Sequence, residues 1–180
     1  RKMMPSIIRS VARGLSTQAV AVAERTERLI AAKQRSGKSF DVLAKELGVT
    51  NAYAAQLLFG QAQLKTATAA KLRAALPDVS DVDIQAMVET FPTRTFDSEL
   101  IKEPNIYRTH EAIMHYGQAI KAIINEQCGD GIMSAIDFYL DVGTTTGING
   151  EKRVVITFNG KFLPHIEQRA DDNTCQSPRD

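Results

Sequence analysis

A helical pattern runs from Ile106 to Gln127 and stops at a Gly-Asp-Gly turn, residues 129–131. At 3.6 residues per turn, this pattern separates an apolar face from a polar face. The apolar face carries Ile106, Ile113, Tyr116, Ile120, Ile123 and Ile124. The polar face carries Arg108, Glu111, His115 and Gln118. Glycines on both sides of an aspartate let a backbone reverse direction. The sequence therefore predicts one long amphipathic helix followed by a sharp turn.

Three side chains around this helix suit the binding of a small anion. Arg108 and Glu111 are three residues apart, so they are neighbours on the polar face, and Ser134 follows the turn. An arginine supplies a permanent cation with several donors, a serine supplies a hydroxyl, and a glutamate can orient the arginine or move a proton. Spacing alone favours a simpler interpretation, in which Arg108 and Glu111 form an ordinary surface pair and Ser134 merely begins a strand.

The motifs around these residues resemble those of the cyanases (cyanate hydratases). They are the YRxxE motif at residues 107–111, the run GDGIMSAIDF at 129–138 and the run VVITFNGKFLP at 154–164, and the resemblance extends from about Glu24 to Pro164. The resemblance implies that Arg108, Glu111 and Ser134 are catalytic. It implies that the protein decomposes cyanate to ammonia and carbon dioxide through carbamate, in a reaction that depends on bicarbonate. This reaction would detoxify cyanate. It also implies that bicarbonate is a co-substrate, that no metal or other cofactor takes part, and that a homodecamer built from dimers forms the sites.

Composition and charge are those of an ordinary globular protein. The 180 residues are 43% hydrophobic and 24% charged, with a formal net charge of +1. This balance predicts no general attraction to nucleic acid or to a membrane surface, and no apolar run is long enough to cross a bilayer. Cys128 and Cys175 are too few for a disulfide framework or a metal motif.

The first half of the chain predicts five short helices. Glycines and prolines separate five helical patterns, and Ser39 and Ser80 are placed to cap two of them. The patterns cover Gln18–Gln34, Phe40–Leu47, Thr50 or Asn51 to Gly60, Leu64–Leu76 and Asp81–Glu89. The second and third match a helix-turn-helix of the repressor-like type. We therefore predict an α+β fold, mainly α, that begins with a five-helix bundle.

A helix-turn-helix raises the alternative of a DNA-binding regulator whose C-terminal domain senses a small anion. The segment that would enter the major groove, residues 50–59, contains no Lys or Arg, and only Asn51 and Gln56 suit base edges. Such a helix lacks the phosphate contacts that supply most of the affinity. A second alternative is a structural oligomer that has lost its activity, against which the intact trio of Arg108, Glu111 and Ser134 argues.

The second half predicts a long helix and a small β-sheet that form an intertwined dimer. The strand candidates are Ser134–Val142, Arg153–Phe158 and Lys161–Leu163, with a polar loop at Gly143–Gly150 and a tight hairpin turn at Asn159-Gly160. One helix and a few short strands bury little apolar surface by themselves, so pairing with a second copy is expected.

These patterns predict five regions along the chain. The bundle occupies residues 24–91, a linker 92–103, and a catalytic and dimerisation domain 104–166, between an extension at 1–23 and a disordered tail at 167–180. The extension contains Arg, Lys and Ser but no acidic residue before Glu24, which resembles an organelle transit peptide. The alternative is a terminus without a targeting role, and the default expectation is a cytoplasmic protein.

Two further residues invite a chemical role. His115 shares the polar face with Arg108 and Glu111, and histidine is a common general base. Cys128 precedes the Gly-Asp-Gly turn, but no neighbour in sequence would lower the pKa of its thiol. We expect Cys128 to be a small packing residue and His115 to lie outside the catalytic trio.

Overall fold

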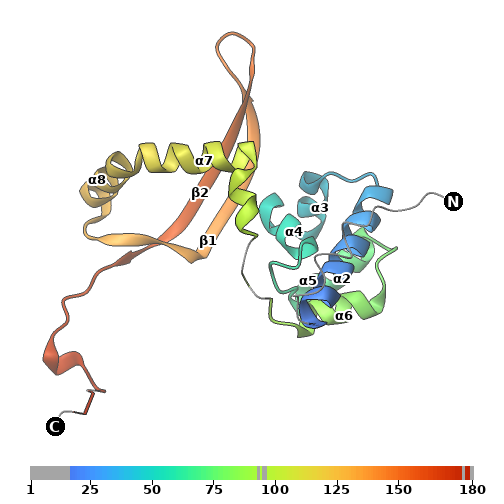
Figure 1. Cartoon of the computed structure of the whole chain (residues 1–180), viewed down its shortest axis with the longest axis horizontal. Helices are drawn as coiled ribbons and strands as arrows, with labels where there is room; N and C mark the ends of the chain where they lie inside the picture. The colour runs from blue at the N-terminus through green and yellow to red at the C-terminus, as the bar shows by residue number, and fades with distance from the viewer. Residues whose placement is uncertain (1–16, 93, 95–96, 176, 179–180) are drawn as a thin grey trace. The chain divides into compact units, whose positions relative to one another are not determined.

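The computed structural model describes residues 17–92, 94, 97–175 and 177–178. Within these residues the chain is mainly helical, with one two-stranded sheet of order β1-β2 (Figure 1). This confirms the predicted mainly α fold with a small sheet. Of the predicted extension at 1–23, residues 1–16 lie outside the described residues, and α2 begins at Thr17.

The chain separates into two compact units. One contains the chain up to position 95 together with Leu140–Thr157, and the other contains Phe96–Tyr139 and Phe158–Asp180. The boundary at 140 and 157 divides the β-hairpin, whose distal part is grouped with the helices of the first unit. Arg108, Glu111 and Ser134 all belong to the second unit.

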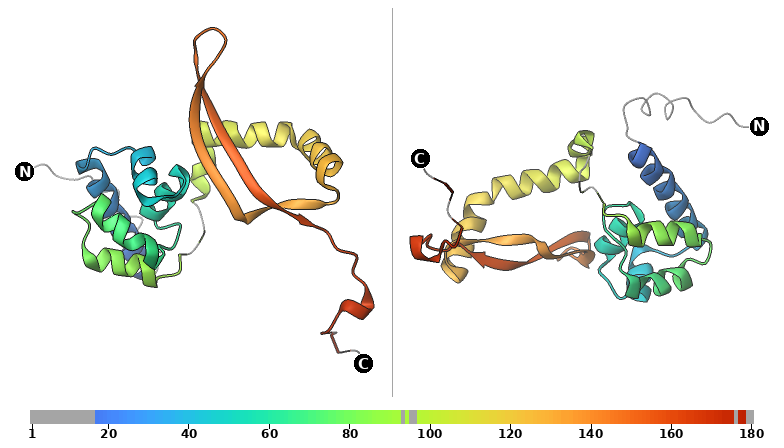
Figure 2. Two further views of the ribbon diagram at one scale, coloured as in Figure 1. Left: turned by 180° about the vertical axis from the view of Figure 1, so that it is seen from behind. Right: turned by 90° about the horizontal axis from the view of Figure 1, so that it is seen from below.

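Five helices of the first unit form the predicted bundle (Figures 1 and 2). They are α2 (Thr17–Arg35), α3 (Phe40–Leu47), α4 (Asn51–Leu58), α5 (Thr66–Ala75) and α6 (Asp81–Glu89). Their core is rich in leucine because one apolar stripe of each helix faces the centre. The largest fully buried side chains are Leu29, Leu43, Leu47, Leu57, Leu58, Leu64, Leu72 and Leu76. Burying each such side chain contributes roughly 1.5–3 kcal/mol.

Local capping explains where these helices begin and end. The hydroxyls of Ser39, Thr50 and Ser80 accept hydrogen bonds from backbone amides of the first turns of α3, α4 and α6. Gly48 ends α3 in the left-handed conformation, with φ 74°. The predicted caps at Ser39 and Ser80 are confirmed, and Thr50 rather than Asn51 caps α4. The helix-turn-helix type of the bundle stays a prediction.

The predicted long helix is two helices, so the prediction of one continuous helix was wrong. A 3-10 helix, η1 (Ser98–Lys102), lies within the predicted linker and precedes α7 (Pro104–His115) and α8 (Gly117–Cys128). Tyr116 separates α7 from α8, with φ −92° and ψ 4°, and its amide is shared between the carbonyls of Ala112 and Met114. Gly117 follows directly, and a glycine weakens a helix by about 1 kcal/mol relative to alanine. The helix therefore bends at this position (Figure 1).

Two long strands replace the three predicted short ones. β1 spans Gly131–Thr146 and β2 spans Lys152–Pro164, so Asn159-Gly160 lies inside a strand and the predicted turn there was wrong. The chain reverses instead at 147–151, where the Gly147 amide donates to the Glu151 carbonyl and Gly150 has φ 80°. The first half of the predicted loop at Gly143–Gly150 is part of β1, so the prediction of a loop there was wrong for Gly143–Thr146. The last described elements are a 3-10 helix, Ala170–Asp172, and the residues around it, all exposed.

Candidate active site

Helix α7 presents Arg108 and Glu111 as an exposed ion pair. The Arg108 Nη1 lies 2.6 Å from the Glu111 Oε2, and the two side chains are 71% and 50% exposed. The helix start is well defined because Pro104 occupies the first turn and the Glu103 carboxylate accepts from the Ile106 amide. The predicted neighbourhood of Arg108 and Glu111 on one helix face is therefore confirmed.

Two neighbouring side chains, Glu111 and Tyr107, stabilise the positive charge of Arg108. The hydrogen bond that Arg108 donates to Glu111, followed by the charge of that carboxylate, raises the pKa of the Arg108 guanidinium. The guanidinium carbon also lies 5.5 Å from the centre of the Tyr107 ring, within the range of a cation–π contact. Within the described part of the chain, Arg108 makes no other hydrogen bond, so its remaining donors are available to an anion.

Ser134 lies in β1 and differs from its surroundings in burial. Its side chain is 7% exposed, whereas Met133 is 41% and Ile136 98% exposed. The Ser134 Oγ accepts hydrogen bonds from the backbone amides of Ile136, at 3.1 Å, and Asp137, at 3.0 Å. The hydroxyl is therefore held by the strand that carries it.

The single chain brings two of the three predicted residues together. Arg108 and Glu111 are paired on α7, whereas Ser134 lies on β1, after α8 and the glycine turn. Among the residues that the structure describes, no hydrogen bond or ion pair joins Ser134 to either of them. The catalytic role of the trio stays a prediction.

The other residues singled out from the sequence are exposed. His115 is exposed, and its ring meets the Tyr116 ring edge-on at 5.0 Å. Cys128 and Cys175 are both exposed free thiols, so within the single chain Cys128 is not the small packing residue that we expected. No group of three or more His, Cys, Asp or Glu side chains in the described ranges is arranged to hold a metal ion. No helix in that same part of the chain has the length and apolarity to cross a membrane.

Sequence reasoning missed two features of these side chains. The first is the Tyr107 ring near Arg108, which its position next to Arg108 in sequence suggests only weakly. The second is the pair of amides that bind the Ser134 hydroxyl. A serine can hydrogen-bond to amides two and three residues ahead, but a strand pattern gives no sign of it.

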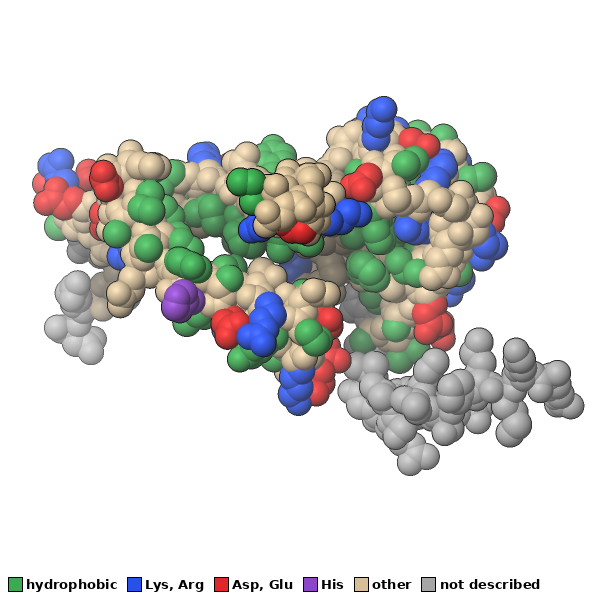
Figure 3. Space-filling view, turned by 90° about the horizontal axis from the view of Figure 1, so that it is seen from above, with side chains coloured by type: hydrophobic (Ala, Val, Ile, Leu, Met, Phe, Trp, Pro, Cys, Tyr) green, Lys and Arg blue, Asp and Glu red, His purple; other side chains and the backbone are tan. Residues whose placement is uncertain are grey.

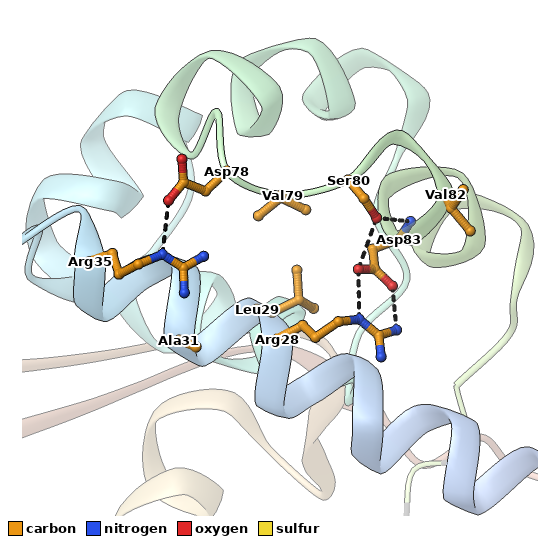
Figure 4. Close-up of a pocket in the computed structure, with 9 residues that line it drawn as sticks. All are labelled: Arg28, Leu29, Ala31, Arg35, Asp78, Val79, Ser80, Val82 and Asp83. Atoms are coloured by element: carbon orange, nitrogen blue, oxygen red, sulfur yellow. Dashed lines mark hydrogen bonds and ion pairs between the residues drawn. The ribbon is translucent and has the colours of Figure 1, made fainter.

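A cavity of about 410 Å³ lies in the helical bundle, and none of the three predicted site residues lines it (Figure 4). Its charged residues are paired with one another: Arg28 binds Asp83, and Arg35 binds Asp78. Ser80 completes the group by donating to the Asp83 carboxylate. These partners satisfy one another and join α2 to the start of α6, so we interpret this cavity as structural and not as the site of chemistry.

Comparisons with known proteins agree on one family. The family model of the cyanate lyase C-terminal domain matches residues 98–167. A cyanate hydratase of Phaeodactylum tricornutum is 65% identical over 164 residues, which are 91% of this chain and 85% of that protein. A cyanate hydratase of Arabidopsis thaliana is 54% identical over 147 residues, 82% and 87% of the two chains. The crystal structure of cyanase from T. urticae matches with a TM-score of 0.69 and 32% identity, covering 79% of this chain and 99% of that one.

Proposed function

This chain belongs to the cyanate hydratase (cyanase) family, and from that premise we propose that Arg108, Glu111 and Ser134 form the site at which cyanate reacts with bicarbonate. It is a lyase that acts on cyanate. The observation that carries the assignment of the site is the Arg108–Glu111 pair, an exposed and permanently charged guanidinium oriented by a carboxylate at 2.6 Å.

The proposed reaction joins two anions and then divides the product. A bicarbonate oxygen forms a bond to the cyanate carbon, and the electron pair of the carbon–nitrogen π bond moves to nitrogen, which takes a proton. Cleavage of the bond between the bicarbonate oxygen and its own carbon releases carbon dioxide, and the proton of the bicarbonate hydroxyl passes to the same nitrogen, which leaves carbamate. Carbamate then takes a proton and separates into ammonia and a second carbon dioxide. The sum is one cyanate, one bicarbonate and two protons to one ammonia and two carbon dioxide, with bicarbonate as co-substrate and without a metal or other cofactor.

Arg108 opposes the repulsion between the two substrates. Both substrates are anions, and charge builds up on the species that they form, so a fixed cation lowers the energy of this species more than that of the separated substrates. The guanidinium offers a planar set of donors that matches a carboxylate-like anion. Glu111 holds the guanidinium in place by accepting its hydrogen bond, and a carboxylate in that position can also carry a proton to the cyanate nitrogen.

Ser134 holds a substrate in position by hydrogen bonding. A hydroxyl donor that fixes cyanate relative to bicarbonate replaces a rare collision of two small anions by an oriented contact, and such orientation is a large part of catalysis. Because Ser134 is not joined to Arg108 in the single chain, we propose that the complete site combines residues of several copies.

Assembly into a homodecamer built from dimers is part of the proposal. The second unit leaves large apolar side chains exposed, among them Ile106, Met114, Tyr116, Ile123 and Ile166. Green apolar side chains are also visible across the face shown in Figure 3. Two helices and a two-stranded hairpin do not make a stable monomer by themselves, so the apolar surface is better explained by contact with further copies.

The alternative of a DNA-binding regulator is not favoured. Helix α4, the would-be recognition helix, has the sequence NAYAAQLL and carries no cation. Without cationic side chains a helix in the major groove gains little from the phosphates. The matches to cyanate hydratases over most of the chain also point to an enzyme.

The test is the release of ammonia from cyanate by the purified protein, with and without added bicarbonate. We expect release that requires bicarbonate and that falls at least about 100-fold in Arg108→Ala, as for the loss of one donor to a developing negative charge. Lys102→Ala is the matched control, because Lys102 is equally exposed and forms an i,i+3 pair with Glu99. Equal activity of the two variants would reject the active-site role and leave Arg108 as a surface pair.

A further inference from the structure

Ser134 is the most deeply buried residue of the C-terminal region. Among the described residues from 97 onward, Ser134 alone is buried, at 7% exposure. All other positions of β1 are exposed or half-buried. A hydroxyl in such a place is held by its neighbours and not by a general apolar core.

Both acceptor positions of the Ser134 hydroxyl are occupied. A serine hydroxyl has one proton to donate and two lone pairs to accept with. The amides of Ile136 and Asp137 donate to the Oγ at 3.1 and 3.0 Å. What remains is the O–H group, which is free to donate. In this arrangement Ser134 offers a hydrogen bond to an anion and has no lone pair left to attack a carbon or to take a proton.

Gly160 on β2 allows the second strand to come close to Ser134. A Cβ atom placed on Gly160 would overlap the Ser134 carbonyl oxygen and the Met133 Cγ, well inside 3.0 Å, and would lie 3.1 Å from the Phe138 ring. The carbonyl oxygen belongs to the backbone and cannot turn aside. Gly160 is also absent from the glycines with positive φ, so the reason for glycine here is space and not backbone conformation.

We propose that Gly160 is a positioning residue for Ser134, and that the two strands together fix the serine as a hydrogen-bond donor to the substrate anion. This inference rests on the proposed function, in which Ser134 binds cyanate or bicarbonate. A side chain at 160 forces β1 and β2 apart or along each other by a distance on the order of 1 Å, and a displacement of that size can lower a rate about 100-fold.

The variant Gly160→Ala tests this, with Gly143→Ala as the matched control. Gly143 lies in β1, its φ is not positive, and a Cβ there meets nothing within 4 Å. We expect kcat for ammonia release to fall roughly 100-fold in Gly160→Ala, with KM much less changed, and to stay at the wild-type value in Gly143→Ala. Circular dichroism and light scattering confirm that each variant is folded and assembled. A wild-type kcat in folded Gly160→Ala would overturn the proposal.

A double variant separates the two contacts of the added methyl group. Met133→Ala in the Gly160→Ala background removes the side-chain overlap but leaves the overlap with the Ser134 carbonyl. We expect the double variant to stay impaired. Recovery of kcat would place the effect in Met133 packing and overturn the proposal. Failure of both variants to assemble would make Gly160 a folding requirement, which also overturns its positioning role.

The donor role of Ser134 depends on the two amides that occupy its lone pairs, and hydrogen exchange tests this without an activity assay. Removing the hydroxyl in Ser134→Ala takes away the acceptor of the Ile136 and Asp137 amides, so the peptide that contains them should exchange faster than in the wild-type protein. Unchanged exchange would show that these amides do not occupy the hydroxyl. A wild-type protein that releases no ammonia defeats the proposed function, whereas an active protein that loses activity in Arg108→Ala but not in Gly160→Ala defeats this inference alone.

Discussion

Two ion pairs join α2 to the beginning of α6, one to the loop that precedes this helix and one to its first turn. The two pairs differ mainly in burial. Arg28 binds Asp83 through two hydrogen bonds, of 3.0 and 2.7 Å, and the Asp83 side chain is only 7% exposed. Arg35 binds Asp78 at 2.9 Å, and both of these side chains are more than half exposed. Figure 4 shows the two pairs on opposite sides of Val79. Replacing either arginine by alanine removes the same charge from the same helix.

Burial of the carboxylate sets the expected difference in stability. In Arg28→Ala the Asp83 carboxylate remains buried with Ser80 as its remaining side-chain partner. Breaking a fully buried pair costs about 3–5 kcal/mol. Arg28 itself is 56% exposed, so water replaces part of its contribution, and the expected loss is that of the Asp83 carboxylate left short of a charged partner, about 1–3 kcal/mol. In Arg35→Ala, water solvates Asp78 freely, so we expect less than about 1 kcal/mol.

The assay is urea unfolding of the 180-residue chain, followed by far-ultraviolet circular dichroism. The protein concentration is fixed, because the proposed assembly would make stability depend on concentration. The midpoint should fall clearly in Arg28→Ala and little in Arg35→Ala, with similar slopes. Equal losses in the two variants would refute the argument that burial of Asp83 decides the energy of these pairs.

The same pair predicts a dependence of stability on pH. The hydrogen bond that Arg28 donates to Asp83 has the largest effect on the pKa of this carboxyl and lowers it below its ordinary value. The hydrogen bond that Ser80 donates lowers the pKa of Asp83 as well. The folded state therefore favours the carboxylate more than the unfolded state does. Its contribution is complete above the unfolded pKa of about 4 and is lost as the pH falls through the lower folded pKa. The difference in free energy of unfolding between wild type and Arg28→Ala should therefore shrink as the pH falls from about 5 to about 2. A constant difference would contradict this assignment.

Two further predictions concern the active site and the assembly. Arg108→Lys keeps the charge but loses the planar set of donors, so ammonia release should fall at least about 10-fold, and wild-type activity would refute the proposed anion clamp. Ile123→Asp places a charge on the exposed apolar face of α8, so light scattering should show a smaller particle, whereas Lys121→Asp on the other side of that helix should not. An unchanged particle in Ile123→Asp would remove α8 from the interface.

Local signals in the sequence predicted most helix boundaries. Helices α3 and α6 begin and end where their caps and the following glycine or proline place them, because a cap acts on amides of the adjacent turn only. The break at Tyr116 was missed, since the apolar positions continue across it at helical spacing and only Gly117 signals a weak point.

The hairpin shows the limit of local signals. The dipeptide Asn-Gly occurs twice, at 149–150 and at 159–160, and each is a strong signal for a tight turn. The chain turns at the first pair, where Gly150 has positive φ, and continues as a strand through the second. Nothing within either dipeptide separates the two cases.

The sequence by itself therefore determined the helical bundle, the pairing of Arg108 with Glu111 and the resemblance to the cyanases, because each depends on residues a few positions apart or on a continuous motif. The tertiary structure alone decided that Gly160 lies against Ser134 and that the serine hydroxyl is buried with its proton left to donate. Those features arise where two strands that are separated by a turn meet, and the steric fit between the strands cannot be deduced from the sequence of either strand alone.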